Sequence, residues 1–284
     1  MKSFFKFFAI FITAVIVIGL ASCSTKNEPD SKTGGLPGKF SVSADKKVEF
    51  SKGNLQYQAS TKTWRFANNQ YDIIGNENKF VGNIGDGWID VFGYGTGYDP
   101  LRTSENYKDY ALFIDWGCNP ISNGGNQANL WRTLEASEWH YLIWLRPNAN
   151  DLLGFGSING INGIFLLPDD WTIPDGAVFY PISQCNMEYD YGIISNSDPY
   201  GDNYSQNTFT IKEWLVLESS GAVFLPAAGY KSYDSMSAYG REGFYWSSTW
   251  DGYNGEHIYF DRNKLISRTS KYHPWNACSV RLVK

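Results

Sequence analysis

Cysteine and histidine side chains supply many protein nucleophiles and most transition-metal ligands, and in this 284-residue chain they are few and widely spaced. Besides Cys23, near the amino terminus, the candidates are Cys118, Cys185, Cys278, His140, His257 and His273. None belongs to a CxxC motif or a Cys–His cluster of the kind that holds zinc. We therefore predict no catalytic residue, no metal site and no cofactor. The three cysteines after Cys23 permit one internal disulfide at most, and their spacing leaves its connectivity open.

Oxygen-bearing side chains and glycine-rich loops offer other kinds of chemistry. The segment from Asp198 to Asn203 carries oxygen ligands at loose spacing but lacks the loop pattern of an EF-hand, so it does not predict calcium binding. The loop from Gly93 to Gly97 is followed by neither the lysine nor the helix that phosphate binding needs. Carboxylates are plentiful, yet no constellation of them predicts general acid–base catalysis.

Cys23 is the one cysteine whose neighbours predict chemistry. Lys2 and Lys6 precede an apolar run over residues 7–20, which suits a signal-peptide core and is short for a membrane-spanning helix. The run leads into Leu20-Ala21-Ser22-Cys23, which resembles the bacterial lipobox, where small residues admit a peptidase and the cysteine thiol is then acylated. We predict a signal peptide over residues 1–22 and lipidation of Cys23, with palmitate among its acyl chains, as a membrane anchor. An ordinary secretory signal is the alternative.

A flexible tether is predicted next, over residues 23–38, because this stretch is polar and rich in glycine and proline. Its Glu28 and Asp30 resemble the acidic surface-export signal of Bacteroides-type lipoproteins, although a solvated linker explains them equally well. The expected location is the outer membrane, facing outward. The remaining residues, 39–284, show no boundary and predict one domain. The formal net charge of −5 argues against a nucleic-acid partner.

Hydrophobic periodicity predicts a mixture of strands and two main helices. Antiparallel strands are expected within residues 39–74, and buried strands at 164–168 and 222–226. One helix is expected from Leu134 to Arg146, with Thr133 as its N-cap. Its apolar face comprises Trp139, Leu142 and Ile143.

The second predicted helix begins at Thr210, where Thr210 and Glu213 fit a capping box, and it ends at Gly221. Its apolar side chains are Trp214, Leu215 and Leu217.

The carboxyl-terminal part predicts further strands. Over residues 257–262, alternation points Ile258 and Phe260 inward and His257, Tyr259 and Asp261 outward. Residues 279–283 form the last predicted strand, with Val280 and Leu282 on one face. We expect this closing strand to pair near the amino-terminal strands of the domain.

Three motifs in this order resemble formylglycine-generating-enzyme-like domains: residues 131–139 (WRTLEASEW), 245–249 (YWSST) and 279–284 (SVRLVK). The resemblance implies an α+β, C-type-lectin-like fold with antiparallel strands, two main helices and long irregular loops. The whole stretch from Gly38 is similar to the Fibrobacter succinogenes major paralogous domain lipoproteins of Bacteroidetes, through residues 50–57 (FSKGNLQY) and 221–230 (GAVFLPAAGY).

Some relatives of these proteins are targets of diversity-generating retroelements, in which chosen positions near the carboxyl terminus vary on a fixed lectin-like frame. The resemblance implies a ligand-binding surface here, and aromatic, amide and acidic side chains between the frame positions suit one. The predicted ligand-binding residues are Trp250, Asp251, Tyr253, Asn254, His257, Tyr259, Asp261, Asn263, Tyr272, His273 and Asn276. The expected partner is a protein or glycan ligand at the cell surface.

The resemblance does not lead us to predict enzymatic activity for this chain. Formylglycine-generating relatives work through a cysteine pair or a cysteine-bound metal, and the single cysteines here match neither arrangement. The sugar-binding Glu-Pro-Asn or Gln-Pro-Asp tripeptide of calcium-dependent lectins is also absent from the sequence. Besides a variable binding surface, two functions therefore stay open: calcium-independent glycan binding, and a structural surface paralogue without a dedicated ligand.

Overall fold

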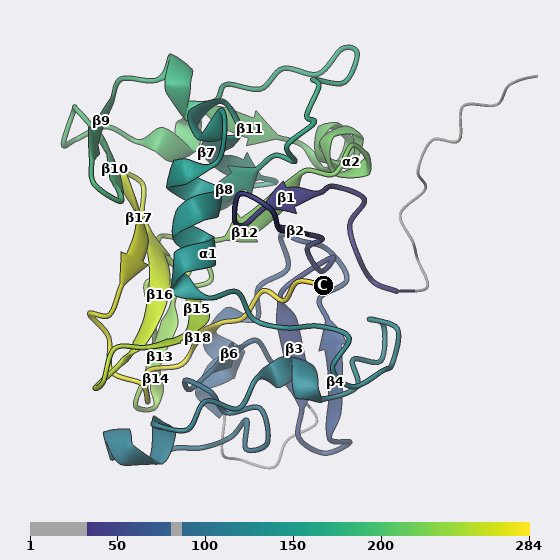
Figure 1. The fold of residues 1–284 in the computed structure, drawn as a ribbon, viewed down its shortest axis with the longest axis vertical. Helices are drawn as coiled ribbons and strands as arrows, with labels where there is room; N and C mark the ends of the chain where they lie inside the picture. Colours follow the sequence, from purple (N-terminus) through teal and green to yellow (C-terminus); the bar gives the residue numbers. More distant parts are fainter. Residues whose placement is uncertain (1–32, 81–86) are drawn as a thin grey trace, which may run out of the picture.

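The computed structural model describes residues 33–80 and 87–284, and Figure 1 shows how they are arranged. The predicted signal peptide, Cys23 and residues 24–32 of the predicted tether lie outside the described residues. Across the described ranges, no helix combines the length and apolar character needed to cross a membrane.

Strands dominate the fold, and most neighbouring strands run antiparallel. The largest sheet has the order β6 (Val91–Phe92), β18 (Cys278–Ser279), β15 (Gly243–Trp250), β16 (Gly255–Phe260), β17 (Lys264–Thr269), β10 (Ile193–Asn196), β9 (Met187–Asp190). A four-stranded sheet has the order β11 (Asn207–Phe209), β7 (Leu153–Ile158), β8 (Ile161–Leu166), β12 (Val223–Pro226). The pairs β15–β18 and β11–β7 are parallel. The predicted α+β class with antiparallel strands is confirmed.

The smaller sheets and the helices complete the architecture. A three-stranded sheet has the order β4 (Thr63–Phe66), β3 (Leu55–Gln58), β5 (Trp88–Ile89), and two hairpins pair β1 (Phe40–Ser41) with β2 (Lys47–Val48) and β13 (Tyr230–Ser232) with β14 (Ser235–Ser237). The α-helices are α1 (Ala136–His140) and α2 (Ile211–Ser219). Short 3-10 turns lie at Gly75–Phe80, Tyr107–Tyr110, Trp116–Cys118, Ala149–Asp151, Ile182–Gln184 and Asn203–Ser205.

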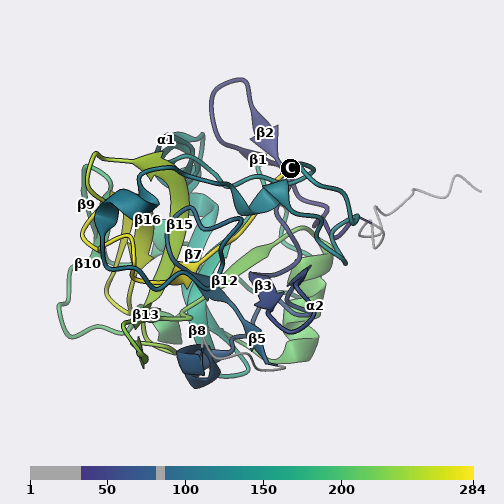
Figure 2. The ribbon, with the colours of Figure 1, turned by 90° about the horizontal axis from the view of Figure 1, so that it is seen from below.

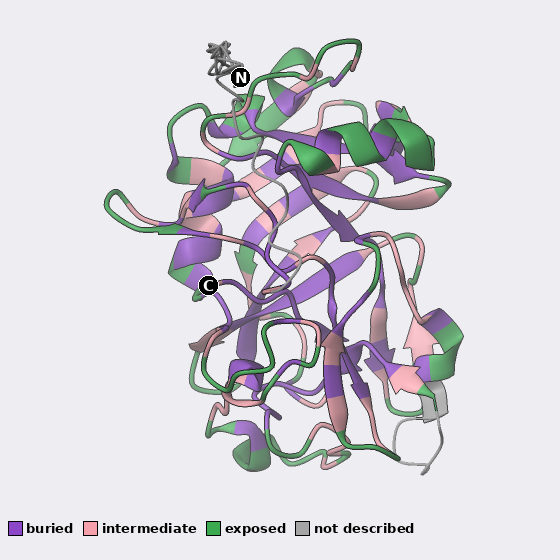
Figure 3. Cartoon of the chain, turned by 90° about the vertical axis from the view of Figure 1, so that its right-hand side faces the viewer, coloured by how far each residue is buried: buried purple, intermediate pink, exposed green. Residues whose placement is uncertain are grey.

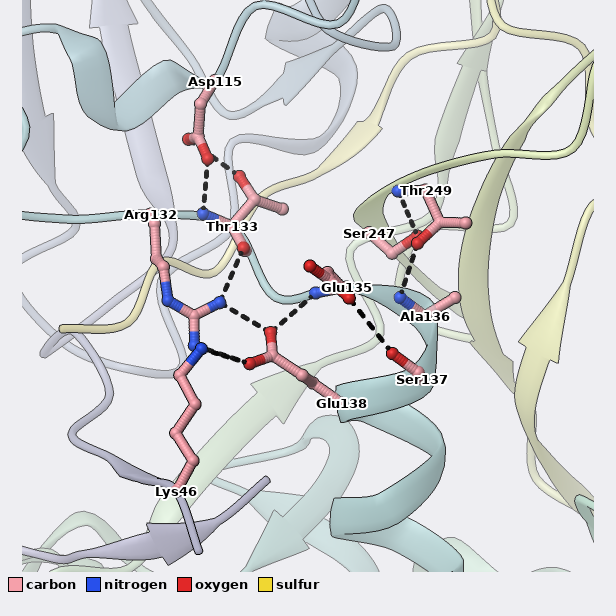
Figure 4. A network of polar contacts seen from close by, with 10 residues as sticks. All are labelled: Lys46, Asp115, Arg132, Thr133, Glu135, Ala136, Ser137, Glu138, Ser247 and Thr249. Atoms are coloured by element: carbon pink, nitrogen blue, oxygen red, sulfur yellow. Dashed lines mark hydrogen bonds and ion pairs between the residues drawn. The ribbon is translucent and has the colours of Figure 1, made fainter. Parts of the chain in front are cut away.

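The first predicted helix is shorter and less regular than expected. After α1, a π-helical turn continues the chain over Tyr141–Leu145. Glu135 occupies the N-cap position, so the prediction of Thr133 was wrong. The reason is a contact from elsewhere in the chain: the Asp115 carboxylate accepts hydrogen bonds from the Thr133 amide at 2.9 Å and hydroxyl at 3.0 Å (Figure 4).

A polar network fixes α1 against its surroundings (Figure 4). Glu138 accepts two hydrogen bonds from the Arg132 guanidinium, at 2.6 and 2.8 Å, and one from the Lys46 ammonium at 2.8 Å. At the start of the helix, the Ala136 amide donates to the Thr249 hydroxyl on β15 at 2.9 Å. Glu138 and Lys46 therefore join the helix to the β1–β2 hairpin, and the Ala136–Thr249 hydrogen bond joins it to the large sheet.

Helix α2 matches its prediction closely. Thr210 is the N-cap, and the Thr210 amide donates to the Glu213 carboxylate at 2.8 Å, which confirms the capping box. The helix ends just before Gly221, whose φ of +94° favours glycine. Trp214 and Leu217 are buried as expected, but Leu215 is 51% exposed. Figure 3 shows the molecule from the side on which α2 lies, with most residues of this helix exposed.

The two helices cover opposite faces of the four-stranded sheet, as the view in Figure 2 shows. Trp139 of α1 belongs to the same buried cluster as Ile164 and Leu166 of β8. Phe165, on the other face of β8, instead packs with Trp214 of α2, at 5.6 Å between ring centroids. The predicted buried strands around residues 164–168 and 222–226 are therefore confirmed, and they form the centre of this half of the molecule.

The carboxyl terminus lies in the middle of the fold, beside the amino-terminal hairpin (Figure 1). The Leu55 amide donates to the Val280 carbonyl, and the Ser51 amide to the Leu282 carbonyl, each at 2.9 Å. The predicted pairing with amino-terminal strands is confirmed, and Val280 and Leu282 are both buried. Regular strand geometry covers only β18, although the Val283 backbone also exchanges hydrogen bonds with the Arg132 backbone, at 2.8 and 2.9 Å.

Candidate binding site

The structure divides the eleven predicted ligand-binding residues among three places. Trp250, Asp251, Tyr253 and Asn254 lie at the tip of the β15–β16 hairpin. His257, Tyr259, Tyr272, His273 and Asn276 lie on or beside one face of the large sheet. Asp261 and Asn263 form the turn between β16 and β17 and line a pocket.

At the hairpin tip, Asp251 and Tyr253 are the predicted residues that are exposed. Tyr253 is 70% exposed, and its ring lies 6.0 Å from that of Tyr107. Trp250 packs against Tyr94 at 5.3 Å and is only partly accessible. Asp251 accepts the amide hydrogen bonds of Tyr253 at 2.8 Å and Asn254 at 2.6 Å, so its carboxylate forms the turn.

The predicted outward face of β16 is covered, and the expectation that His257 is an exposed contact residue was wrong. The alternation itself is correct, because Ile258 and Phe260 belong to the core around α1, whereas His257 faces the other side. There its ring is 1% exposed, with Trp246 at 5.4 Å and Tyr272 at 5.7 Å. Burial lowers the pKa of His257 to about 4, so the imidazole is neutral at physiological pH.

Neighbouring residues of this face take part in the same aromatic layer. The Phe244 ring lies 5.1 Å from that of Tyr259 and 4.9 Å from those of Tyr272 and Tyr230. Asn276 is also buried, contrary to its predicted role. A surface role is thus contradicted for His257 and Asn276 because a second layer, from β13 and the segment before β18, packs over the sheet. His273 stays exposed and stacks on Trp275 at 4.3 Å.

The third place is a polar pocket of about 510 Å³, a volume within the usual range for small-molecule sites. It lies where the β16–β17 turn meets the start of β8, the Asn203–Ser205 turn and the residues just before β15. Its lining residues are Asn162, Asp202, Tyr204, Arg241, Glu242, Asp261, Arg262 and Asn263. We refer to this cavity as the polar pocket.

Hydrogen bonds hold the walls of the polar pocket in place. The Tyr259 hydroxyl donates to the Asp261 carboxylate at 2.6 Å, and the backbone amides of Asn263 and Lys264 donate to its other oxygen at 2.7 and 3.0 Å. Across the cavity, the Tyr204 hydroxyl donates to the Arg241 carbonyl at 2.9 Å. Asp261 therefore positions the turn as well as lining the cavity.

Several groups around the polar pocket retain hydrogen-bonding capacity for a ligand. Burial raises the pKa of the Glu242 carboxyl, and the negative charge of Asp261 raises it further. Arg241 and Arg262 are exposed, and neither forms an ion pair with any described residue. The side-chain oxygen of Asn263 is buried and has no hydrogen-bond partner in the described part of the chain. The pocket thus presents donors and acceptors together.

Sequence reasoning missed most of this pocket. Asn162, Asp202 and Arg241 come from three separate segments of the sequence, and no sequence motif connects these segments. The signal nearest to it was the oxygen-rich segment from Asp198 to Asn203. In that segment, however, the Asp198 and Asp202 carboxylates accept hydrogen bonds from the backbone amides of Tyr200 and Tyr204, at 2.9 and 3.0 Å. Aspartates in turns commonly form such bonds.

One Ser–His contact deserves comparison with a nucleophile–base pair. His140 Nδ1 lies 2.8 Å from Ser267 Oγ, which donates to the Gly192 carbonyl at 3.1 Å. Because the serine proton is used in that bond, Nδ1 must carry the proton between the two side chains. Ser267 is also fully buried. This geometry joins β17 to α1 and gives His140 no role as a base toward Ser267. Cys118, Cys185 and Cys278 are all free thiols.

Comparison with known proteins locates one similarity in the carboxyl-terminal third of the chain. Residues 195–283 match the model of a domain of unknown function, DUF8237. No curated protein and no solved structure matches the chain. The matched stretch contains every predicted ligand-binding residue and all the lining residues of the polar pocket except Asn162.

Proposed function

We propose that this chain is a binding protein of the cell envelope, anchored through a lipid on Cys23, and that the polar pocket takes a hydroxyl-rich ligand, a glycan. The observation that carries the proposal is a preformed cavity of about 510 Å³ lined by two exposed arginines, Arg241 and Arg262, that form no ion pair with any described residue. Sugar hydroxyls both donate and accept, so they can bond the Arg241 guanidinium and the Glu242 carboxylate simultaneously. No step of this recognition requires calcium or a catalytic residue.

Electrostatics support a ligand with little net charge. Three carboxylates and two guanidinium groups line the polar pocket, so their formal charges nearly cancel. A strongly charged ligand would meet groups of its own sign as well as of the opposite sign. A neutral glycan avoids that repulsion and still finds charged groups as strong hydrogen-bond partners.

We also propose a C-type-lectin-like arrangement for the domain. It is supported by the position of the carboxyl-terminal residues Val280–Lys284, which bond the amino-terminal segment and close the domain. A second support is the order of the three motifs that resemble formylglycine-generating-enzyme-like domains. An experimental structure superposed on lectin-like domains tests this proposal, and a different strand order would overturn it.

A glycan array probed with the detergent-solubilised full chain tests the proposed function, with and without EDTA. We expect binding to at least one glycan that EDTA leaves unchanged. Glu242→Gln should weaken it about tenfold, because the variant removes a charged hydrogen-bond acceptor. Glu188→Gln, an exposed glutamate on β9, is the matched control and should bind normally. Equal binding by both variants would contradict the assignment of the pocket.

A second candidate function is protein binding at the hairpin tip, favoured by the 70% exposure of Tyr253 beside Tyr107. An exposed tyrosine pair supplies contact area at low entropic cost, as binding loops do. This tip also suits a segment diversified by a retroelement, since exposed side chains there can change with little loss of packing. The genomic neighbourhood tests this: a reverse transcriptase beside a near-copy of the final coding segment is expected, and its absence counts against diversification.

A further inference from the structure

A second pocket, separate from the polar pocket, lies where the β3–β4 turn meets the loops at residues 97–100 and 119–126. Its volume is about 460 Å³, and Tyr57, Trp64 and Tyr98 are among its lining residues. It shares no lining residue with the polar pocket. Figure 1 shows β3 and β4 in the lower half of the molecule, whereas β8 and β17, beside the polar pocket, lie in the upper half. We call this cavity the aromatic pocket.

The walls of the aromatic pocket are bonded to one another. The Ser122 amide donates to the Trp64 carbonyl at 2.9 Å, which ties one loop to β4. The Asn119 side-chain amide donates to the Gly97 carbonyl at 2.7 Å, which ties the two loops together. A side chain at Gly97 would place its Cβ 2.5 Å from the Asp115 carbonyl oxygen, so the close approach of the loops requires glycine. The cavity is therefore preformed, and a ligand need not order it.

The side chains of the aromatic pocket combine flat rings with polar groups, of which the Lys62 ammonium is the one that carries a charge. Tyr98 is 75% exposed, whereas Tyr57 and Trp64 are largely buried and their two ring centroids lie 4.6 Å apart. Asn119 and Asn126 add side-chain amides. Among the described lining residues there is no carboxylate.

From this chemistry we propose that the aromatic pocket is a second binding site, which takes a neutral saccharide. The C–H face of a pyranose ring packs on an exposed aromatic ring such as Tyr98, while its hydroxyls bond the amides of Asn119 and Asn126. A neutral sugar fits a lining whose one charged side chain is Lys62, because sugar hydroxyls can accept a hydrogen bond from its ammonium, whereas a cationic ligand would find no carboxylate there. The site is independent of the polar pocket, so either assignment can fail without the other.

Calorimetry on the detergent-solubilised full chain tests the proposal, with neutral gluco-, xylo- and manno-hexasaccharides as probes and a proline-rich decapeptide as the competing ligand class. We expect at least one hexasaccharide to bind. Tyr98→Ala should weaken that binding about tenfold, since it removes the stacking ring. Tyr98→Phe keeps the ring and should bind within about twofold of the parent. Tyr233→Ala removes a tyrosine that is 64% exposed elsewhere and is the matched control.

The outcomes separate the two sites. A hexasaccharide whose affinity falls with Tyr98→Ala but not with Glu242→Gln supports the aromatic pocket. A hexasaccharide that responds only to Glu242→Gln overturns this inference and supports the proposed function of the polar pocket. Binding of the decapeptide alone, equal effects of Tyr98→Ala and Tyr233→Ala, or no binding of any hexasaccharide would each overturn the inference.

Discussion

His257 provides a direct test of the covered face of β16, through the pH dependence of stability. His257 is surrounded by aromatic rings and is only 1% exposed, and its Nε2 has no hydrogen-bond partner among the described residues. Burial lowers the pKa of its imidazole to about 4. A histidine whose pKa is lower in the folded protein stabilises the fold above its unfolded pKa, about 6.5, and loses that contribution as pH falls toward 4. The difference between the two pKa values corresponds to about 3 kcal/mol.

The substitution His257→Phe keeps an aromatic ring of similar shape and removes the proton-binding group. Asp90 has the opposite effect in an overlapping range: burial raises its pKa to about 6, so its contribution is present below pH 3.8 and lost as pH rises to 6. The parent curve alone therefore mixes both groups. Subtracting the curve of the His257→Phe variant from that of the parent removes Asp90 and leaves the histidine.

Denaturant unfolding of parent and variant at several pH values between 4 and 7.5 supplies the difference curve. We expect the parent to lose about 3 kcal/mol relative to His257→Phe as pH falls through this range. The control variant is His273→Phe, which replaces an exposed histidine. It shows how much the free energy of unfolding changes when a histidine outside the buried layer is replaced. A flat difference for His257→Phe would refute the buried aromatic layer and restore His257 as a surface residue.

Three other predictions concern the core of the large sheet, the closing segment and the lipidation of Cys23. Phe260→Ala should lower the free energy of unfolding by about 3–5 kcal/mol, whereas Tyr253→Ala should change it by less than about 1 kcal/mol. Chemical denaturation measures both, and similar losses would mean that the hairpin tip is buried. Deleting residues 279–284 should abolish cooperative melting, since it removes the backbone partners of residues 49–55; an unchanged melting temperature would contradict this. Cys23→Ala should lose metabolic palmitate label, and equal labelling of mutant and parent would exclude lipidation there.

Local patterns predicted the elements whose signals lie within a few residues. The capping box of α2 could be predicted because Thr210 and Glu213 are three residues apart and satisfy each other. The start of α1 could not, because Thr133 is bonded by Asp115, which lies 18 residues away and arrives through tertiary packing. Propensity and capping patterns contain no information about such distant partners.

Alternation along β16 predicted which side chains share a face but not whether that face is covered. Ile258 and His257 do lie on opposite sides, yet both are buried, because the strand is central in its sheet and packed on both faces. The polar pocket was largely unpredictable for a related reason. Asn162, Tyr204 and Glu242 are far apart in the sequence, and only the folded chain brings them together.

A crystal structure of the chain with its best glycan from the array tests the central claim most directly. The proposed function predicts a saccharide in the polar pocket, with hydroxyls at hydrogen-bond distance, about 2.7–3.2 Å, from the Glu242 carboxylate and the Arg241 guanidinium. A second saccharide in the aromatic pocket would be compatible with this result. A saccharide bound elsewhere, with the polar pocket holding only water, would contradict the claim.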